Sequence, residues 1–253
     1  MVLGSRPRKD LPITRLLPNM LTLVSLCSGL TAMRFATEER WHEAVLALTV
    51  AAIFDVLDGR VARMLNIASK FGAELDSLSD AISFGVAPGF IMYEWVLKTD
   101  HNIGWIAALV YAVCTALRLA RFNTMLEDHS APAWAKSYFT GVPAPGGAGL
   151  AILPLNIVLQ FGQGMQLPTI AIAVWLMLVG GLMVSRLPTL SLKGRRIKPI
   201  WVAPVFVLAV LLTAIMITNP WLTLTGIGLL YMVSLPIGWY SYHRREKLEA
   251  QET

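Results

Sequence analysis

The sequence predicts an all-α integral membrane protein, a polytopic transmembrane helical bundle of about eight spans with both termini in the cytoplasm. Three observations support this class. The 253 residues are 55% hydrophobic and only 15% charged, and the mean hydropathy is +0.59, which is too apolar for a soluble core of this length. Long apolar segments recur along the chain, and the basic residues between them alternate from one side to the other.

A helix needs about 20 apolar residues to cross the hydrocarbon core of a bilayer. No soluble domain interrupts the pattern, so we expect one integral membrane domain over residues 1–253. The segments that meet this requirement are 16–36, 42–65, 73–97, 103–124, 142–161, 167–185, 201–218 and 221–241.

The basic residues provide an independent test of this topology, because Lys and Arg accumulate in cytoplasmic loops. With the N-terminus in the cytoplasm, eighteen of the 21 basic residues fall on the inner side, and Arg34, Arg40 and Lys98 fall outside. The net charge of +5 then reflects attraction to anionic lipid of the cytoplasmic membrane, and no nucleic acid partner is needed to explain it.

Four aspartates interrupt the second and third apolar segments near their predicted cytoplasmic ends. Asp55 and Asp58 are spaced i and i+3, and Asp76 and Asp80 are spaced i and i+4, so each pair shares one face of its helix. Two neighbouring antiparallel helices can direct all four carboxylates into one pocket. Carboxylates at membrane depth are costly unless a partner compensates them, so we expect a functional site here.

Hard oxygen ligands at this density suit Mg²⁺ or Mn²⁺, and four carboxylates are enough for a two-metal centre. Two other interpretations explain the same residues. Arg60, Arg63 and Lys70 could neutralise the aspartates in structural ion pairs, although buried ion pairs seldom repay their desolvation. Intramembrane carboxylates also line ion pathways, which leaves a divalent cation transporter as the alternative from another functional class.

The spacing of these residues resembles the signature of the CDP-alcohol phosphotransferase family. The matching string is Asp55-xx-Asp58-Gly59-xx-Ala62-Arg63, then eight residues, then Gly72-xxx-Asp76-xxx-Asp80. The resemblance implies that the four aspartates bind the metals and that Asp80 also accepts the proton of the attacking hydroxyl. It further implies contacts to the CDP group of the donor, made by the following residues: Asn19, Thr22, Gly59, Ala62, Arg63, Ser69 and Gly72.

The acceptor alcohol is indicated by other segments, which resemble the serine-using branch of that family. These segments are 18–30, 76–88, 116–124 and 141–145. The resemblance implies a catalytic core at about residues 12–150, with additional transmembrane helices at about 151–241. It implies transfer of a phosphatidyl group from CDP-diacylglycerol to L-serine, giving phosphatidylserine and CMP. The same chemistry with glycerol phosphate, inositol phosphate or choline is the nearest alternative.

Candidate residues for the acceptor side are Arg118, Arg121, Asn123 and Lys70. Arg118 and Arg121 are spaced i and i+3, so one helical face would present two guanidinium groups to a serine carboxylate, to phosphates or to lipid headgroups. Topology alone also places arginines at a cytoplasmic helix end. Membrane lipid is an expected partner, and the Gly180-Gly181 pair offers a close-packing surface for a homodimer.

Overall fold

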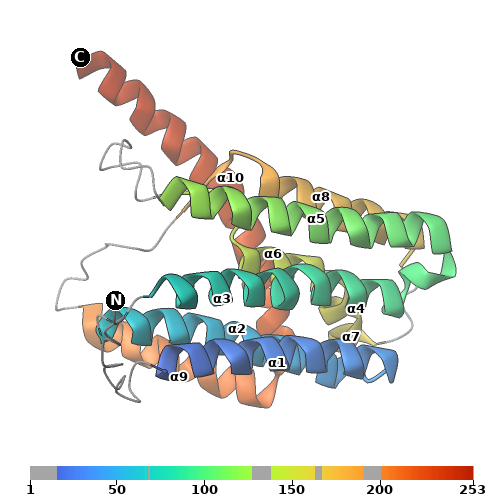
Figure 1. Cartoon of the computed structure of the whole chain (residues 1–253). Helices are drawn as coiled ribbons and strands as arrows, with labels where there is room; N and C mark the ends of the chain where they lie inside the picture. Colours follow the sequence, from blue (N-terminus) through green and yellow to red (C-terminus); the bar gives the residue numbers. More distant parts are fainter. Residues whose placement is uncertain are drawn as a thin grey trace, which may run out of the picture.

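The computed structural model of the chain describes residues 16–65, 67, 69–126, 138–162, 167–190 and 201–252, and helices account for most of them (Figure 1). The helices are α1 (Leu17–Thr37), α2 (Trp41–Met64), α3 (Lys70–Asp80), the π-helix η2 (Ala81–Val86), α4 (Ala87–Trp95), the 3₁₀-helix η3 (Leu97–Thr99), α5 (His101–Leu126), α6 (Ala144–Ala151), α7 (Leu153–Phe161), α8 (Thr169–Val184), α9 (Val202–Thr218) and α10 (Pro220–Glu252).

Each of the predicted apolar segments coincides with a helix or with a run of consecutive helices. The third segment is covered by α3, η2 and α4, and the fifth by α6 and α7, which meet at a bend of 43°. Among the described residues, three helices are individually long and apolar enough to cross a membrane, within α1, α5 and α10, and the bent pair raises that number to four. The chain is therefore a helical membrane protein.

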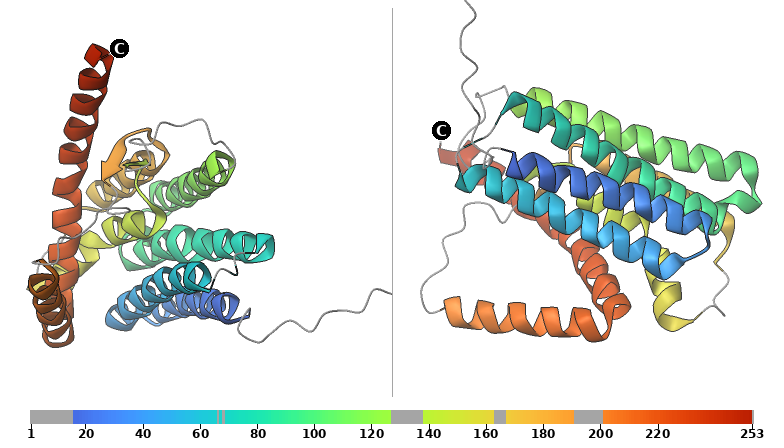
Figure 2. Two further views of the ribbon diagram at one scale, coloured as in Figure 1. Left: turned by 90° about the vertical axis from the view of Figure 1, so that its left-hand side faces the viewer. Right: turned by 60° about the horizontal axis from the view of Figure 1, so that its bottom comes forward.

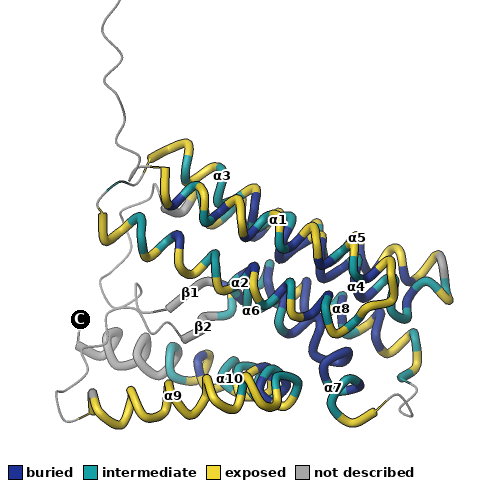
Figure 3. The backbone as a smooth tube through the Cα atoms, turned by 90° about the horizontal axis from the view of Figure 1, so that it is seen from below, coloured by how far each residue is buried: buried dark blue, intermediate teal, exposed yellow. Residues whose placement is uncertain are grey.

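The exterior of the helical bundle is apolar over large areas, as expected for a surface that lipid covers. Helix α9 shows this most clearly, since Phe206, Val210 and Ile217 are each at least 67% exposed. This helix lies against α10 at one edge of the molecule (Figure 2), and exposed residues follow it along its length (Figure 3). A soluble protein would not present such a helix to water.

Small residues allow α1 to pack closely against both α2 and the α3–η2 helix. Ser25 donates a hydrogen bond to the Ala51 carbonyl of α2 at 2.8 Å, and the Ser83 hydroxyl of η2 donates to the Ser25 carbonyl at 3.3 Å. Gly29 leaves no room for a side chain, because a Cβ there would lie 2.9 Å from the Ser83 Cα. Helix α1 thus fixes the positions of the two segments that carry the aspartates.

The π-helix begins directly after Asp80, a feature that the sequence analysis did not predict. A π-turn leaves backbone groups displaced from the regular α-helical hydrogen-bond pattern. Here the buried Tyr111 of α5 donates its hydroxyl proton to the Phe84 carbonyl at 2.9 Å. Small residues line this contact between η2 and α5. A Cβ at Gly85 would lie only 3.0 Å from the Thr115 Cβ. Helix α5 thereby packs tightly against the segment that follows Asp80.

Helix α5 packs against α8 on its other side. A Cβ at Gly180 would lie 3.3 Å from the Cβ of Cys114, so Gly180 serves a contact within the chain. Its neighbour Gly181 is exposed and has nothing within 4 Å. Gly180, one of the two glycines predicted to form a dimer surface, therefore packs against α5 within the same chain.

A short antiparallel ribbon joins β1 (Tyr138–Thr140) to β2 (Pro188–Leu190), and the all-α prediction did not include it. The ribbon is followed by Gly141 with φ at +79°. A Cβ at this position would lie 2.6 Å from the Met183 carbonyl oxygen. Glycine is therefore required both by the backbone conformation and by the close approach of the C-terminal end of α8.

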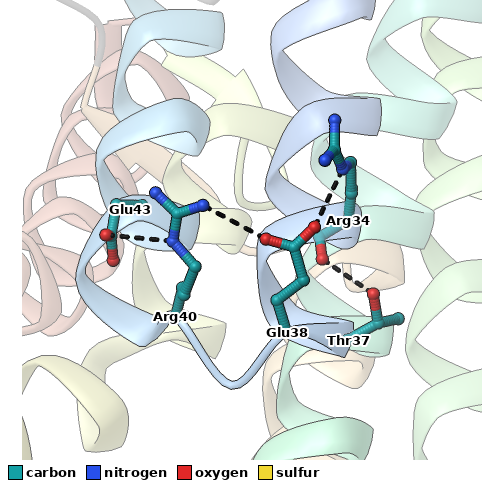
Figure 4. Close-up of polar contacts among 5 residues, drawn as sticks. All are labelled: Arg34, Thr37, Glu38, Arg40 and Glu43. Carbon is teal, nitrogen blue, oxygen red and sulfur yellow. Dashed lines mark hydrogen bonds and ion pairs between the residues drawn. The ribbon is translucent and has the colours of Figure 1, made fainter.

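The three basic residues predicted on the outer side are all compensated by nearby carboxylates. Arg34 and Arg40 form ion pairs with Glu38 at 2.9 and 3.1 Å, and Figure 4 shows how the two arginines flank this carboxylate. Lys98 lies 3.4 Å from Glu94. Hydrogen bonds from Arg34, and next from Arg40, lower the pKa of the Glu38 carboxyl. These exceptions to the charge bias therefore add little net positive charge to their side of the protein.

The Gly29 contact gives a test of this packing. We expect Gly29→Ala to lower the thermal unfolding temperature in detergent, because the new methyl group overlaps the η2 backbone and overpacking costs about 1–3 kcal/mol. Gly181→Ala is the matched control, since it adds the same methyl group to a helix interior with nothing within 4 Å. The packing account is wrong if the two variants unfold at the same temperature.

Candidate metal and nucleotide site

Three of the four aspartates converge at one place in the bundle. One carboxylate oxygen from each of Asp55, Asp76 and Asp80 lies within 4.8 Å of the other two, and all three residues are half-buried. Asp55 comes from α2, while Asp76 and Asp80 come from successive turns of α3. The helical spacing that predicted a shared pocket is realised for these three side chains.

The fourth aspartate, Asp58, is held differently. It is 3% exposed, and its Oδ2 accepts a hydrogen bond of 2.5 Å from the Thr22 hydroxyl of α1. The Thr22 hydroxyl, which was predicted to contact the CDP group, therefore bonds to one of the predicted metal ligands. Asp58 remains one turn from Asp55 on α2, but it is outside the group of three converging carboxylates.

Basic side chains do not neutralise this site. Within the described residues, no ion pair involves any of the four aspartates, and the ion pairs gather around Glu38, Glu39, Glu43 and Glu94. Arg60, Arg63 and Lys70 are all exposed, so the structural ion-pair interpretation finds no support. Three like charges held this closely in a partly dehydrated space repel one another, and a bound cation removes that penalty.

The donor set fits a hard divalent cation. It consists of carboxylate oxygens, with no cysteine or histidine in the group, and such oxygen sets suit Mg²⁺, Mn²⁺ or Ca²⁺. The cluster could therefore hold a metal ion, and its composition argues against a thiolate-preferring metal.

The residues predicted to contact a nucleotide lie on α1, α2 and α3 beside the carboxylates. Ser69 caps α3 by accepting a hydrogen bond of 3.0 Å from the Gly72 amide. A Cβ at Gly72 would lie 2.9 Å from the Asn19 Oδ1, so Asn19, Ser69 and Gly72 form one cluster. Gly59 lies near the Arg63 guanidinium, since a Cβ there would be 3.6 Å from Nη1. Ala62, on the same helix, is half-buried.

The four acceptor-side candidates are not brought together. Arg121 donates to the Val184 carbonyl at 2.7 Å and so ties α5 to α8. Asn123 donates to the Ser77 hydroxyl at 2.9 Å and so ties α5 to α3. Lys70 is exposed in the first turn of α3. Only Arg118 is buried, at 9% exposed, and it lies on α5 between Tyr111 and Asn123, which bond to Phe84 and Ser77 on either side of Asp80.

A cavity of about 290 Å³ lies one turn beyond the carboxylates. Its lining includes Ala52, three residues before Asp55, and Phe84, four residues after Asp80. Tyr231 of α10 also lines it, and sequence reasoning did not single out this residue. A signal was available, because Tyr231 lies in the middle of an apolar segment, whereas tyrosines in membrane helices prefer the interfaces.

Metal binding should appear as a change in stability. We expect Mn²⁺ at about 100 times its Kd to stabilise the wild type by about 2.7 kcal/mol. Asp76→Asn should unfold at a higher temperature than the wild type without metal, because one of the three repelling charges is gone, yet gain less from Mn²⁺.

The matched control for Asp76→Asn is Glu74→Gln, an exposed carboxylate two residues away. It should behave as the wild type in both conditions. Equal stabilisation of the wild type and Asp76→Asn by Mn²⁺ would show that this cluster is not the metal site.

Comparison with known proteins agrees with this geometry. The model of the CDP-alcohol phosphatidyltransferase family matches residues 15–240. The CDP-diacylglycerol–serine O-phosphatidyltransferase of Mycobacterium leprae is 38% identical over 247 residues, which cover 97% of this chain and 81% of that protein. The proteins of the same name from Mycobacterium tuberculosis (strain CDC 1551 / Oshkosh) and Methanocaldococcus jannaschii are 37% and 36% identical, over 90% and 52% of this chain and 82% and 56% of theirs. The protein is therefore a member of the CDP-alcohol phosphatidyltransferase family.

Proposed function

We propose that this enzyme transfers a phosphatidyl group from CDP-diacylglycerol to the hydroxyl of L-serine, releasing phosphatidylserine and CMP. The observation that carries the proposal is the convergence of Asp55, Asp76 and Asp80, which form no ion pair with a basic residue in the described part of the chain. The names of the relatives above, two of which align with at least 90% of this chain, support serine as the acceptor. Another acceptor, such as glycerol phosphate, inositol phosphate or choline, would use the same carboxylates.

The proposed reaction is a single displacement at phosphorus. The serine hydroxyl oxygen attacks the phosphorus that bears diacylglycerol, the bond from that phosphorus to the oxygen of CMP breaks, and the hydroxyl proton passes to Asp80. The four aspartates would hold a two-metal centre of Mg²⁺ or Mn²⁺, which would neutralise the diphosphate and the departing CMP. We assign Asp80 as the base because it is the last residue of α3 and one of the three converging carboxylates.

The donor would lie along α1, α2 and α3. Asn19, Ser69 and Gly72 form one side of this region, where the missing side chain of Gly72 leaves room for the Asn19 amide. Gly59, Ala62 and Arg63 form the other, and the exposed Arg63 guanidinium can donate to a phosphate. Thr22 would act through Asp58, whose carboxylate it orients.

The acceptor would enter from the opposite side, next to α5. Arg118 is the candidate that the structure supports best, because it is buried on the stretch of α5 that bonds to the α3–η2 helix on either side of Asp80. Arg121 and Asn123 already bond to neighbouring helices, so we assign them the role of positioning α5. The exposed Lys70 can attract anionic lipid or a phosphate.

The proposed topology has about eight spans, cytoplasmic termini and an active site that faces the cytoplasm across the inner membrane. Residues at about 12–150 would form the catalytic core, and the helices at about 151–241 would complete one integral membrane domain over residues 1–253. A homodimer is compatible with the apolar exterior. A divalent cation transporter is less favoured, because the carboxylates that converge in the described part of the chain form a single cluster and offer no second layer for an ion path.

Activity with defined substrates tests the function. Purified enzyme with CDP-diacylglycerol and Mn²⁺ should release CMP when L-serine is added, and much less with glycerol phosphate, inositol phosphate or choline. Asp80→Asn should lower kcat by about 10²-fold to 10⁴-fold, which is the usual contribution of a general base. Serine-independent release, or near-normal turnover by Asp80→Asn, would contradict the assignment. Metal flux into liposomes without nucleotide chemistry would favour the transporter.

Topology can be tested by labelling single cysteines after Cys27 and Cys114 have been replaced by alanine. We expect Thr37→Cys to react with a membrane-impermeant maleimide on intact cells, because the end of α1 is predicted outside. Met64→Cys, at a residue 81% exposed near the end of α2, should react only after permeabilisation. The reverse pattern would overturn the proposed orientation.

A further inference from the structure

Two buried polar groups near the carboxylates have no partner among the described residues. One is the Nε of Arg118, and the other is the hydroxyl of Tyr231. Arg118 is 9% exposed and makes no ion pair with a described carboxylate. The Arg118 guanidinium carbon lies 5.8 Å from the centroid of the Phe122 ring, which is a distant contact. Groups that stay buried without a partner lower stability, so a protein that keeps two of them has a reason to do so.

The two groups face a common region. Arg118 lies on α5 between Tyr111 and Asn123, whose side chains bond to Phe84 and Ser77 on either side of Asp80. Tyr231 of α10 lines a cavity together with Phe84. Tyr231 reaches this region because α6 supplies a glycine opposite its ring. A Cβ at Gly146 would lie 3.1 Å from the Tyr231 hydroxyl oxygen, so any larger residue would push the ring away. Arg118 and Tyr231 thus approach Asp80 from α5 and α10.

This region lies across Asp80 from the residues proposed to bind the nucleotide. Figure 1 shows α3 between α5 on one side and α1 and α2 on the other, and hydrogen bonds join α3 to both Asn123 of α5 and Thr22 of α1. An in-line displacement needs the attacking and leaving oxygens on opposite sides of the phosphorus. With CMP leaving toward α1 and α2, the nucleophile approaches from the side of Arg118 and Tyr231.

A guanidinium N–H and a phenol O–H are both donors, and together they suit an anion. Serine reacts through its hydroxyl, and its one anionic group is the carboxylate. We propose that Arg118 and Tyr231 together bind the carboxylate of the acceptor serine and hold its hydroxyl toward Asp80. This inference rests on the proposed function. It adds Tyr231, from the C-terminal part of the chain, as a residue that determines acceptor specificity.

The test compares Tyr231→Phe with the wild type in the CMP-release assay. Loss of one hydrogen bond to a charged group should raise the KM for L-serine about tenfold or more, with the KM for CDP-diacylglycerol unchanged. The unfolding temperature should stay equal or rise, because the variant removes an unpartnered hydroxyl. Tyr240→Phe is the matched control, since Tyr240 is on the same helix and 67% exposed, and it should leave every parameter unchanged.

A second variant tests the pairing of the two residues. Arg118→Lys keeps a positive charge and loses the Nε donor, so it should also raise the KM for serine. The effects of Arg118→Lys and Tyr231→Phe should be non-additive if both bind one carboxylate.

The inference is overturned if Tyr231→Phe leaves the KM for serine within twofold of the wild-type value, if it raises the KM for CDP-diacylglycerol equally, or if it lowers kcat alone. These results require a wild type that is active with serine. A wild type that releases no CMP with serine would instead refute the proposed function.

Discussion

Three carboxylates held within 4.8 Å of one another in a half-buried space are the constraint on which this structure depends. Like charges at that separation repel strongly when the surroundings exclude water. The described part of the chain offers them no ion pair, whereas at the opposite end of the bundle Glu38, Glu39, Glu43 and Glu94 are all paired with bases. The contrast shows that the chain can balance carboxylates with its own bases, and that at this site it leaves three carboxylates without such a partner, in a group that could hold a divalent cation.

The helices around the site keep the carboxylates together against that repulsion. Helix α1 contributes small residues that allow α2 and the α3–η2 helix to approach it closely, and its Thr22 holds Asp58. On the other side α5 bonds to the π-helix through Tyr111 and to α3 through Asn123. Asp80 is therefore fixed between two helical surfaces, one that carries residues proposed to bind the nucleotide and one that carries Arg118. Such preorganisation is what a displacement without a covalent enzyme intermediate requires.

Much of this was predictable from the sequence because the signals are local. Apolar segments of bilayer length predicted where the helices lie, although α10 continues to Glu252. The spacing of four predicted that Asp76 and Asp80 share a face, and the expected pairing of the two neighbouring helices brought Asp55 to them. The remaining features depend on contacts between distant segments. Helical spacing gave Arg118 and Arg121 one face, yet Arg121 bonds to the Val184 carbonyl of α8, while Arg118 is buried. The pairing of β1 with β2 and the bond that holds Asp58 to Thr22 likewise join segments far apart in the sequence, which periodicity does not encode.

The most direct test of the central claim is to locate the metal itself, by anomalous diffraction at the manganese edge from crystals of the protein grown with Mn²⁺ and CDP-diacylglycerol. The account predicts anomalous density between α2 and α3, within ligand distance of Asp55, Asp76 and Asp80 and next to the diphosphate. Bound CDP-diacylglycerol with no manganese between those carboxylates, or manganese held only by the glutamates at the other end of the bundle, would contradict it.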